Sequence, residues 1–477
     1  MDLQLPSAVL VILSTLQSHG FTCEIVGGAV RDVLLGRETT DWDFTTNATP
    51  EEILPLFQES FYENQFGTVM LAHKHLLEQF PEELSSSPLP PDLVFDITTY
   101  RADGEYRNHR KPESVVWGKT IEEDLERRDF TINAIALRVS SNDSIEINTA
   151  TNPGYELVHV ELIDPFHGED DLENKVIRTV GDPDARFSED ALRMLRAIRF
   201  ANSLQFTIDG PTLTALQKHA EELRHISFER ISSEFMSMMA SDTPDIAIVL
   251  LDKFGLLAYI IPELLAAKGV RQSGHHIYDV WEHSIRALAA CESNDPVVRL
   301  ATLLHDIAKP ITAQETHGGT VTFYNHEVIG ARMAKEIGKR LRLPKEACDR
   351  MFTLVRWHMF TYETFVTDAY IRRFLRRVGT ENMEDMFALR TGDRIGSGSK
   401  ATSWRLEELK DRIWAELHQP LKVTDLAIDG NDLMQAFEIK PGPIIGKVLN
   451  DLLEDVLENP DHNTKELLLE KARALIV

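Results

Sequence analysis

Two aspartates separated by one residue, Asp41 and Asp43, are the first candidates for chemistry in this sequence of 477 residues. In an extended segment, residues i and i+2 point to the same face, so both carboxylates would meet at one site. Neighbouring carboxylates repel each other, and a cation that prefers oxygen ligands, such as Mg²⁺, relieves that repulsion. Asp96, in the strand-like segment 94–98, is a candidate third carboxylate. Because Asp-x-Asp pairs are also common on solvated turns, the pair alone does not establish a metal site.

A glycine pair and two adjacent arginines are candidate phosphate-binding groups. Gly27 and Gly28 follow the apolar segment 23–26 and open a helix-like segment at 30–35. Glycines at such a place let backbone N–H groups approach a phosphate. Adjacent arginines can hold a triphosphate through forked, charge-assisted hydrogen bonds, and an asparagine adds a neutral donor. The residues concerned are Arg127, Arg128 and Asn133, although with Asp129 as a cap they are also typical of a charged helix start.

A third pair, Asp190 and Arg193, falls in the helical pattern of residues 188–200. At positions i and i+3 of a helix, the two side chains share a face. A carboxylate acceptor beside a guanidinium donor can imitate the hydrogen-bonding edge of a nucleobase. However, such a pair is more often an ordinary surface salt bridge, and the two residues by themselves favour that interpretation.

Histidines and aspartates in the second half of the chain form a candidate metal site. His305 and Asp306 are adjacent in the apolar helical segment 297–308. Their partners, in sequence order, are His283, His326, His358 and Asp393. His283 and Asp393 would complete one site for a divalent transition metal, and the other two histidines could enlarge it to two metals. Any single histidine is more often structural, so the prediction depends on the ordered series.

The elements around these residues predict an α+β head followed by an all-α body. The head mixes a helical segment at 5–17 with strand-like segments at 23–26, 94–98 and 114–117, and a loop is expected at 140–155. After about residue 165 the pattern is almost wholly helical. We therefore expect a head at 1–165, a helical neck at 166–270, a metal-binding helical domain at 271–400 and a helical tail at 401–477.

Composition excludes several classes of protein. Hydrophobic residues make up 43% and charged residues 26%, which are ordinary globular values. No apolar run reaches the ~18 residues of a membrane span, and the first helical segment lacks the basic start and cleavage site of a signal peptide. The widely spaced Cys23, Cys291 and Cys348 favour a reducing cytoplasm. The net charge of −26 opposes nucleic-acid binding overall, but basic clusters such as residues 372–377 leave local contact with RNA open.

Taken together, the motifs resemble class II tRNA nucleotidyltransferases and bacterial poly(A) polymerases of the polymerase-β superfamily. The matching stretches, in that family's order, are EIVGGAVRDVLLGRETTDWDFTTNATPEEI, ERRDFTINAIA, GDPDARFSEDALRMLRAIRFA and ISFERISSEF. The tail segments DLAIDGNDLM and IKPGPIIGKVLNDLLEDVL also resemble the family. The series of histidines and aspartates resembles HD-domain phosphohydrolases, a module that some bacterial members of the family carry.

The resemblance implies a polymerase-β-like nucleotidyltransferase head with a mixed sheet, and a helical HD domain. It implies that Asp41 and Asp43 hold two catalytic metals, here Mg²⁺, beside Asp96. Nucleotide binding is assigned to Gly28, Arg31, Arg127, Arg128, Asp129, Asn133, Asp190, Arg193 and Arg196, of which Asp190 and Arg193 would select the base. The implied reaction is template-independent addition of CCA to the 3′ end of tRNA from CTP and ATP, with an additional HD phosphohydrolase activity.

Several alternatives remain open. Within the family these are an A-adding tRNA nucleotidyltransferase and a poly(A) polymerase. An enzyme that adds only C is disfavoured, because residues 98–124 resemble the family's loop at full length, although Lys111 stands where the family usually has His. Outside the family, an HD nucleotidase with an inactive head and a non-catalytic RNA-binding protein are opposed by the intact Asp41 and Asp43. The tRNA could follow the basic helix at 372–377 or the tail past residue 420, and the sequence does not indicate the oligomeric state.

Overall fold

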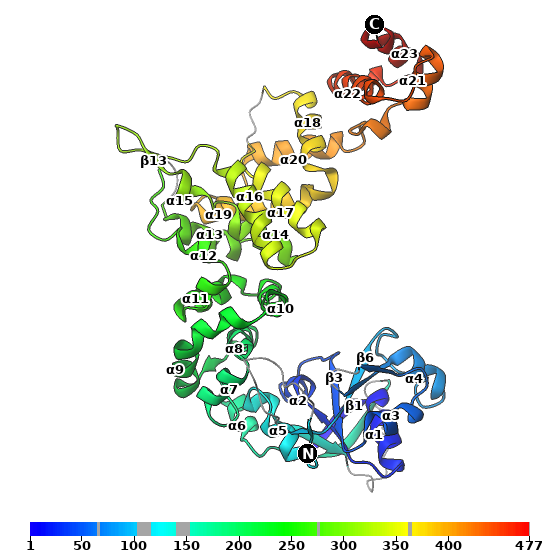
Figure 1. Cartoon of the computed structure of the whole chain (residues 1–477), viewed down its shortest axis with the longest axis vertical. Helices are drawn as coiled ribbons and strands as arrows, with labels where there is room; N and C mark the ends of the chain where they lie inside the picture. Colours follow the sequence, from blue (N-terminus) through cyan, green and yellow to red (C-terminus); the bar gives the residue numbers. More distant parts are fainter. Residues whose placement is uncertain (64–66, 103–115, 140–152, 274–276, 361–364, 477) are drawn as a thin grey trace. The chain divides into compact units, whose positions relative to one another are not determined.

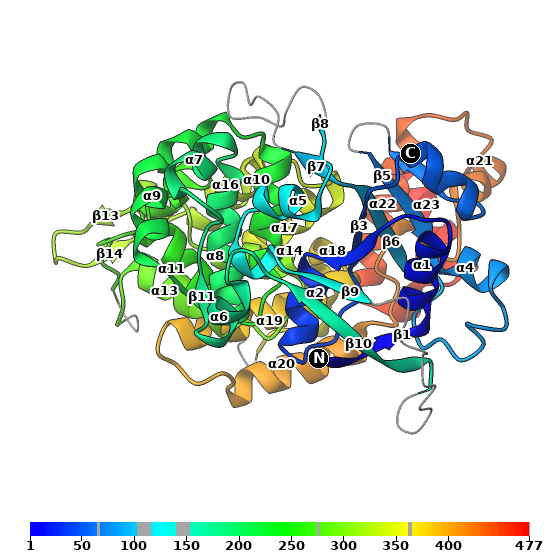
Figure 2. The same ribbon diagram turned by 90° about the horizontal axis from the view of Figure 1, so that it is seen from below.

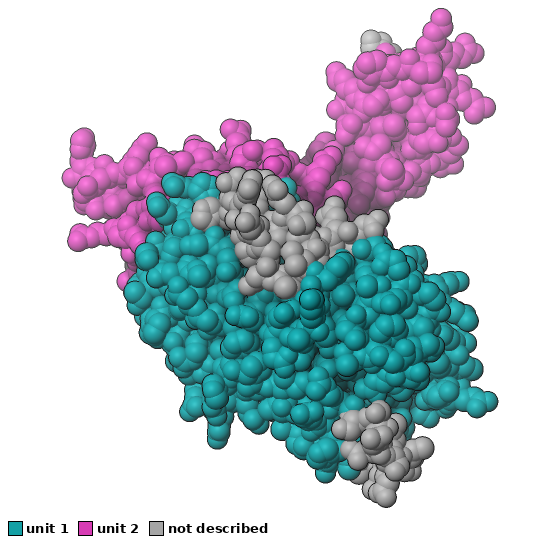
Figure 3. Space-filling model, turned by 60° about the horizontal axis from the view of Figure 1, so that its bottom comes forward, with its two compact units in different colours: residues 1–234, 250–259 teal, residues 235–249, 260–477 magenta. Residues whose placement is uncertain are grey.

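The computed structural model describes residues 1–63, 67–102, 116–139, 153–273, 277–360 and 365–476 (Figure 1). The chain divides into two compact units, coloured teal and magenta in Figure 3. The first unit comprises residues 1–234 and 250–259, and the second comprises residues 235–249 and 260–477. The main sheet belongs to the first unit, whereas the described part of the second is helical apart from one short hairpin.

The first unit is built on a mixed sheet of eight strands with the order β1-β10-β9-β2-β3-β6-β5-β4. Their bounds are β1 (Asp2–Pro6), β2 (Cys23–Val26), β3 (Trp42–Thr46), β4 (Phe61–Glu63), β5 (Thr68–Ala72), β6 (Val94–Thr99), β9 (Ala136–Val139) and β10 (Tyr155–Ile163). Strands β3 and β6 pair in parallel and lie side by side (Figure 2), whereas the other neighbours are antiparallel. This mixed sheet confirms the expected α+β head.

The parallel pairing of β3 with β6 places Asp43 directly opposite Asp96. On the other side of β3, Val26 of β2 is the partner of Asp43. Because alternate residues of a strand face opposite sides, Trp42 and Phe95 point the other way, and both are buried in the core. The centre of the sheet therefore presents carboxylates on one face and packs an apolar core under the other.

Two sequence expectations for the head are wrong. The first helix, α1 (Ser7–Ser18), begins later than expected, because residues 2–6 form β1 and pair with β10. The loop expected at 140–155 ends in strand β10, which starts at Tyr155. Residues 140–152 of that loop lie outside the described residues, as do residues 103–115 of the long segment at 98–124. The strand expected at 114–117 is represented by β8 (Val116–Trp117), which pairs with β7 (Arg101–Ala102).

The first unit also contains helices, some between the strands of the sheet and others after it in the chain. The elements used below are α2 (Gly28–Leu34), α5 (Ile121–Glu126), α7 (Pro183–Glu189), α8 (Leu192–Leu204), α9 (Gly210–His219) and α10 (Phe228–Met239), whose last residues belong to the second unit. The helix expected over 188–200 is broken at Asp190, which has an extended backbone with φ −149° and ψ 101°. Its carboxylate accepts a hydrogen bond from the backbone N–H of Leu192 at 3.1 Å. An aspartate that binds its own backbone in this way favours ending one helix and starting the next.

The second unit is a helical assembly, as expected. Its main helices are α13 (Val280–Ala289), α14 (Pro296–Leu304), α16 (His326–Arg340), α17 (Lys345–Trp357), α18 (Asp368–Val378), α19 (Met383–Gly396), α20 (Trp404–Glu416), α21 (Gly430–Phe437), α22 (Pro443–Glu458) and α23 (Lys465–Ile476). Helix α13 packs on α14 and α19, and α16 packs on α17. The short hairpin consists of β13 (Gln314–Glu315) and β14 (Val321–Thr322). Among the described residues, no helix combines the length and apolar character needed to cross a membrane.

The arginines of helix α18 hold the second unit together. Arg372 is buried and donates to the backbone carbonyls of Leu457 and Glu458 at the end of α22. Arg373 and Arg376 form ion pairs with the carboxylate of Glu454 at 3.0 and 2.6 Å. The guanidinium groups of these three arginines therefore already have carboxylate or carbonyl partners within the second unit.

Two candidate active sites

A cavity of about 540 Å³ lies over the centre of the head sheet. It brings together most of the site residues expected from the sequence: Gly28, Arg31, Asp41, Asp43, Asp96, Arg127, Arg128, Asp129, Asn133 and Arg196. It is also lined by residues that were not among the candidates, namely Thr68, Thr98, Arg101, Arg199 and Phe200. Carboxylates and guanidinium groups thus share one cavity, which suits an anionic substrate that is bound together with cations.

The two neighbouring aspartates carry the electrostatic signature of a cation site. Asp41 immediately precedes β3, and Asp43 is its second residue. Burial, reinforced by the nearby charge of Asp41, raises the pKa of Asp43 to about 6, although Arg128 acts in the opposite direction. A pair of carboxylates that disfavours its own ionisation gains free energy when a divalent cation binds between them. These residues therefore fit the metal that the family resemblance implies.

Gly27, at the start of α2, is required by its surroundings. Its φ of 75° lies in the left-handed region that favours glycine. A Cβ atom at this position would lie 3.0 Å from both the Arg128 guanidinium and a carboxylate oxygen of Asp43. The absence of a side chain therefore lets the backbone approach the carboxylate and the arginine at the floor of the cavity.

Asp129 is the centre of a buried polar network beside the carboxylates. It accepts hydrogen bonds from Arg196 at 2.6 Å and from Asn133 at 3.1 Å. Burial would raise the pKa of Asp129, but Arg196 outweighs it and lowers the pKa to about 2. Asn133 in turn accepts from Arg31 at 2.9 Å. The four polar residues expected to bind nucleotide are therefore fixed in place by one another.

Phe200 is a site residue that sequence reasoning missed. Its ring centroid lies 5.1, 5.2 and 4.3 Å from the guanidinium carbons of Arg31, Arg196 and Arg199. Cations over an aromatic face are attracted by the ring quadrupole, and the flat ring also orients them. In the sequence, a phenylalanine at helical spacing among apolar residues is typical of core packing and gives no signal of this role.

Asp190 and Arg193, which the resemblance assigns to base selection, pair with other residues and not with each other. Asp190 binds Arg230 of α10, with the closest oxygen–nitrogen distance at 2.6 Å. Arg193 instead binds Glu189 at 2.5 Å and the backbone carbonyls of Arg186 and Arg127. The break between α7 and α8 separates the two side chains, so the expected i,i+3 contact is wrong. Among the described residues that line the head cavity, neither Asp190 nor Arg193 is included.

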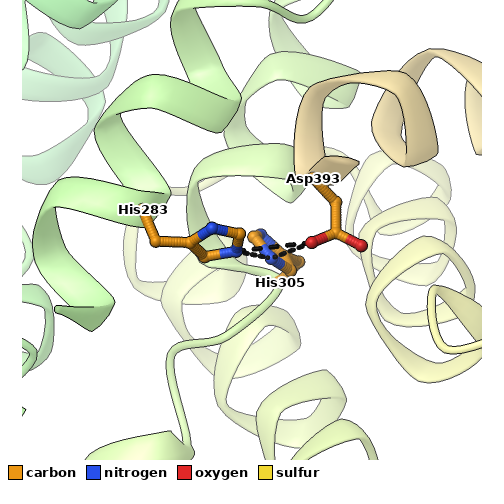
Figure 4. Close-up of side chains that lie close together, drawn as sticks. All are labelled: His283, His305 and Asp393. Carbon is orange, nitrogen blue, oxygen red and sulfur yellow. Dashed lines mark hydrogen bonds and ion pairs between the residues drawn. The ribbon is translucent and has the colours of Figure 1, made fainter. Parts of the chain in front are cut away.

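The second site is a cluster of histidines and aspartates inside the helical unit. His283 comes from α13, His305 follows α14, and Asp393 comes from α19 (Figure 4). Asp306 is the next residue after His305. The Nε2 atom of His283 lies 2.9 Å from Nε2 of His305, 3.2 Å from Asp306 and 3.4 Å from Asp393. The helix expected over 297–308 ends at Leu304, since the His305 side chain bonds the Thr302 carbonyl at 2.7 Å and a new helix starts at Lys309. The helices α13 and α19 and the end of α14 thus converge on one point, as expected.

His326 and His358 extend this cluster. Their Nε2 atoms lie 3.4 and 3.8 Å from the same carboxylate oxygen of Asp306. Both nitrogens are buried and have no hydrogen-bond partner among the described residues. The Nδ1 atoms of both rings are 2.7 Å from backbone carbonyls, which fixes the proton on Nδ1 and leaves Nε2 as a ligand. Buried nitrogens oriented in this way fit a second metal beside the first.

The pKa values of the cluster are coupled. Burial opposes charge on His305, but Asp306 and Asp393 outweigh it and raise the pKa of that imidazole. In return, His305 and Lys309 hold the pKa of Asp306 well below its usual range. His358 differs, because burial and the neighbouring His305 lower its pKa. Geometrically, two overlapping groups are close enough to hold an ion: His283, His305 and Asp393, and His305, Asp306 and His358.

A cavity of about 530 Å³ opens beside the cluster. Asp306, His326 and Asp393 line it together with the cationic side chains of Lys309 and Arg390. The Lys309 ammonium lies 2.6 Å from Asp306, and Arg390 pairs with Asp393 at 2.5 Å. Metal ligands with adjacent cations provide the charge that a phosphate ester requires.

Four family models match successive parts of the chain. The poly A polymerase head domain matches residues 23–178, and the RNA- and SrmB-binding site of polymerase A matches residues 205–268. The HD domain matches residues 274–388, and domain 2 of tRNA nucleotidyltransferase matches residues 401–472. The HD match ends before Asp393, which the sequence predicted as a ligand of this site and which lies in the cluster in the structure.

Named relatives and a solved structure agree with these matches. A CCA-adding enzyme from a Geobacillus species is 39% identical over 252 residues, which are 53% of this chain and 54% of that protein. The chain thus spans about half the length of this relative. An A-adding tRNA nucleotidyltransferase from Deinococcus radiodurans is 32% identical over 348 residues, which are 70% of this chain and 75% of that protein.

The structural match extends over nearly the whole chain. The crystal structure of the Bacillus stearothermophilus CCA-adding enzyme in complex with CTP has a TM-score of 0.67 and 26% sequence identity, and covers 98% of this chain and 97% of that one. The fold of this chain is therefore similar to that of the solved structure over nearly the whole length of both chains. The chain belongs to the tRNA nucleotidyltransferase family, with a poly A polymerase-type head and an HD domain.

Proposed function

We propose that the protein adds CCA to the 3′ end of tRNA, using CTP and ATP and no nucleic-acid template. The observation that carries the proposal is the convergence of Asp41, Asp43 and Asp96 over the parallel pair β3–β6, inside a cavity lined by arginines. The relatives named as CCA-adding enzymes support the same activity. Addition of A alone is the second candidate, because the relative that matches over 75% of its length is named as A-adding.

In the proposed reaction, the 3′-hydroxyl of the RNA attacks the α-phosphate of the nucleoside triphosphate, and pyrophosphate leaves. Arg127 and Arg128 would hold the triphosphate, and Asp129 and Asn133 would orient the sugar. A divalent ion held by Asp41 and Asp43, which we propose is Mg²⁺, would supply positive charge at the attacked phosphate. Positioning and electrostatic stabilisation by these side chains suffice for such a transfer, which requires no covalent nucleophile.

We further propose that Asp190 and Arg193 select the base. Both side chains now bind protein partners, Arg230 and Glu189 respectively, so each must exchange its partner for the edge of the incoming base. Asp190→Ala should therefore alter the preference between CTP and ATP more than it alters the overall rate. An unchanged preference would assign the pair a structural role only.

The decisive experiment supplies purified protein with tRNA that lacks its 3′ end, Mg²⁺ and one labelled triphosphate at a time. Incorporation of both CTP and ATP that stops after three nucleotides is expected. Addition of a single A to tRNA that ends in CC, without incorporation of CTP, would favour the A-adding alternative. Long A tails would indicate a poly(A) polymerase, and wild-type protein no more active than Asp41→Ala would leave only the HD hydrolase.

For the HD domain we propose a metal-dependent phosphohydrolase with a divalent transition metal. The supporting observation is the cluster of buried imidazoles that present Nε2 toward Asp306, beside a cavity with Lys309 and Arg390. A divalent ion held there would polarise a phosphate ester or its attacking water. The double variant His305→Ala, Asp306→Ala should lose bound metal and hydrolysis of a phosphate monoester or 2′,3′-cyclic phosphate. Unchanged hydrolysis would refute the assignment.

We also propose that the functional parts follow the boundaries expected from the sequence, namely 1–165, 166–270, 271–400 and 401–477. The limits of the four matching family models support this division. A cytoplasmic location is proposed on the basis of the three cysteines, which are free and buried in the structure. Such thiols are typical of a reducing compartment.

A further inference from the structure

A single buried carboxylate organises three arginines at the edge of the head cavity. Asp124, on α5, is fully buried, with a side-chain exposure of 0%. One of its oxygens accepts from Arg127 at 2.7 and 3.0 Å, and the other accepts from Arg128 at 3.1 Å. The backbone N–H of Arg101 also donates to it, at 3.2 Å. One carboxylate thus pairs with two guanidinium groups and also holds the backbone of Arg101.

Arg101 is the least compensated of the three arginines. Its guanidinium lines the cavity and donates to the hydroxyl of Thr68 at 2.9 Å. Its Nε is buried and has no hydrogen-bond partner among the described residues, and the same is true of Nε of Arg128. Burial, followed by the like charge of Arg127, lowers the pKa of Arg101 to about 10. Buried N–H donors without acceptors cost free energy, and an anion in the cavity would recover it.

The segment that carries Arg101 is fixed on both sides. The backbone N–H of Gly118 donates to the carbonyl of Tyr100 at 2.7 Å, next to the β7–β8 pairing. Trp117 packs against Gly67 so closely that a Cβ atom on Gly67 would lie 2.1 Å from the indole ring. The position of Arg101 is therefore set by the fold before any ligand binds.

The hydroxyls next to Arg101 lead toward the carboxylates. Thr68 and Thr98 lie 3.1 Å apart through their Oγ1 atoms, and both line the cavity. Thr98 is two residues beyond Asp96 on β6, so the two side chains share a face of the sheet. A phosphate bound by Arg101 would thus lie next to the strand that carries the third carboxylate.

From this arrangement we propose that Arg101 is a phosphate-binding residue of the head site. Together with Arg127 and Arg128 it forms an anion-binding cradle. Asp124 is the positioning residue of this cradle. The proposal rests on the proposed nucleotidyl transfer and deepens it. The bound group is a phosphate of a substrate. Two substrates can supply it, the triphosphate of the nucleotide and the backbone of the RNA, and they are separated by experiment.

The test compares full-length wild type with Arg101→Ala, Arg101→Lys and Asp124→Asn. The matched control is Arg37→Ala, an exposed arginine of the same unit that is not among the residues lining the cavity. Binding of CTP is measured without RNA, and binding of tRNA lacking its 3′ end is measured without nucleotide over a series of salt concentrations. Thermal unfolding of each variant reports whether the fold is retained.

Arg101→Ala should weaken the binding of CTP or of RNA by about tenfold or more, and Arg101→Lys should restore part of the loss. If the phosphate belongs to RNA, the magnitude of the slope of log K against log salt should also fall by about one, the value expected for the loss of one phosphate contact. Asp124→Asn should weaken the same ligand and raise its KM. Affinities for both ligands equal to those of Arg37→Ala would overturn the cradle, as would an Asp124→Asn variant that loses thermal stability but binds normally.

The binding measurements do not depend on turnover, and only the KM of Asp124→Asn does. If the wild type bound CTP and RNA but extended no RNA, the proposed reaction would fail while the cradle could still be judged. If the wild type extended RNA and Arg101→Ala bound both ligands normally, only the cradle would fail. The two hypotheses are therefore tested separately.

Discussion

The two candidate sites neutralise their carboxylates in opposite ways. In the head, burial and the nearby charge of Asp41 raise the pKa of Asp43 to about 6. In the HD cluster, carboxylates and imidazoles alternate, and the pKa values of Asp306 and Asp393 are held well below their usual range. In the first site burial and a neighbouring acid outweigh the effect of Arg128 on Asp43, whereas in the second the neighbouring imidazoles and cations outweigh burial.

This difference bears on where each metal comes from. A pair of repelling carboxylates in an open cavity binds a cation best when an anionic substrate brings further oxygen ligands and charge. A buried cluster with imidazole nitrogens directed at one oxygen is preorganised for an ion that stays bound. We therefore expect the head metal to exchange with solution and the HD metal to remain with the protein.

The largest effect is expected from removing one site at a time. Asp43→Ala should reduce nucleotide incorporation by about 10³-fold or more, because it removes a ligand that acts in the transition state. Hydrolysis by the HD domain should stay within about twofold of wild type. The reciprocal double variant His305→Ala, Asp306→Ala should show the opposite pattern in the same two assays. Parallel loss of both activities in either variant would mean that the sites are not independent.

Metal removal should separate the sites next. Dialysis of the full-length protein without chelator should leave the HD metal in place and remove the head metal, as measured by elemental analysis. Replacing His326 or His358 by alanine should lower the retained metal from about two ions to about one per chain, because each supplies one Nε2 ligand. A wild-type content of no more than one ion would contradict the enlarged site.

The pH dependence sharpens the contrast further. Because the pKa of Asp43 is raised to about 6, the protonated form competes with the cation below that pH. At limiting Mg²⁺, the rate of nucleotide incorporation should fall by about tenfold per pH unit below pH 6. At saturating Mg²⁺, this fall in rate should begin at a lower pH. The measurement is the initial rate between pH 5 and pH 8 at two Mg²⁺ concentrations. A limb that does not move with Mg²⁺ would assign the titration to another group.

The smallest effect is expected from the arginines of α18. Arg373 and Arg376 are paired with Glu454, unlike the unsatisfied arginines of the head cavity. Arg376→Ala should therefore change the affinity for tRNA by less than about twofold, since exposed ion pairs contribute little. Titration of labelled tRNA checks this. A tenfold loss of affinity for tRNA in Arg376→Ala, when Arg37→Ala leaves the salt dependence of binding unchanged, would indicate that α18 is an RNA-binding surface.

The sequence was sufficient to predict those parts of the fold and of the sites in which the residues with chemical roles lie in segments with a clear local pattern. The strand around Asp96 was predicted from β-branched and aromatic residues, Asp43 was placed in an extended segment, and the HD ligands were predicted from their ordered series. Strand β1 was missed because its apolar residues run into the helical pattern of α1, and its partner β10 lies some 150 residues away. Pairing over such a separation leaves no local signal.

The missed site residues have different explanations. Asp124 precedes Arg127 and Arg128 by three and four residues, a helical spacing that could have revealed it. Arg101 and Phe200 acquire their roles only through distant neighbours, Thr68 and Arg31 respectively. Asp190 was misplaced because its capping hydrogen bond to Leu192, a local preference, overrides the helical pattern on both sides.

The parallel pairing of β3 with β6 also constrains how this head can change over evolution. Asp43 and Asp96 meet only through strand register, since the chain between them makes a long excursion through β4 and β5. Insertions or deletions in the surface turns of that excursion leave the carboxylates in place, whereas a slip of one residue within β6 would turn Asp96 into the core. Length variation among relatives should therefore accumulate in those turns and be absent from the two strands.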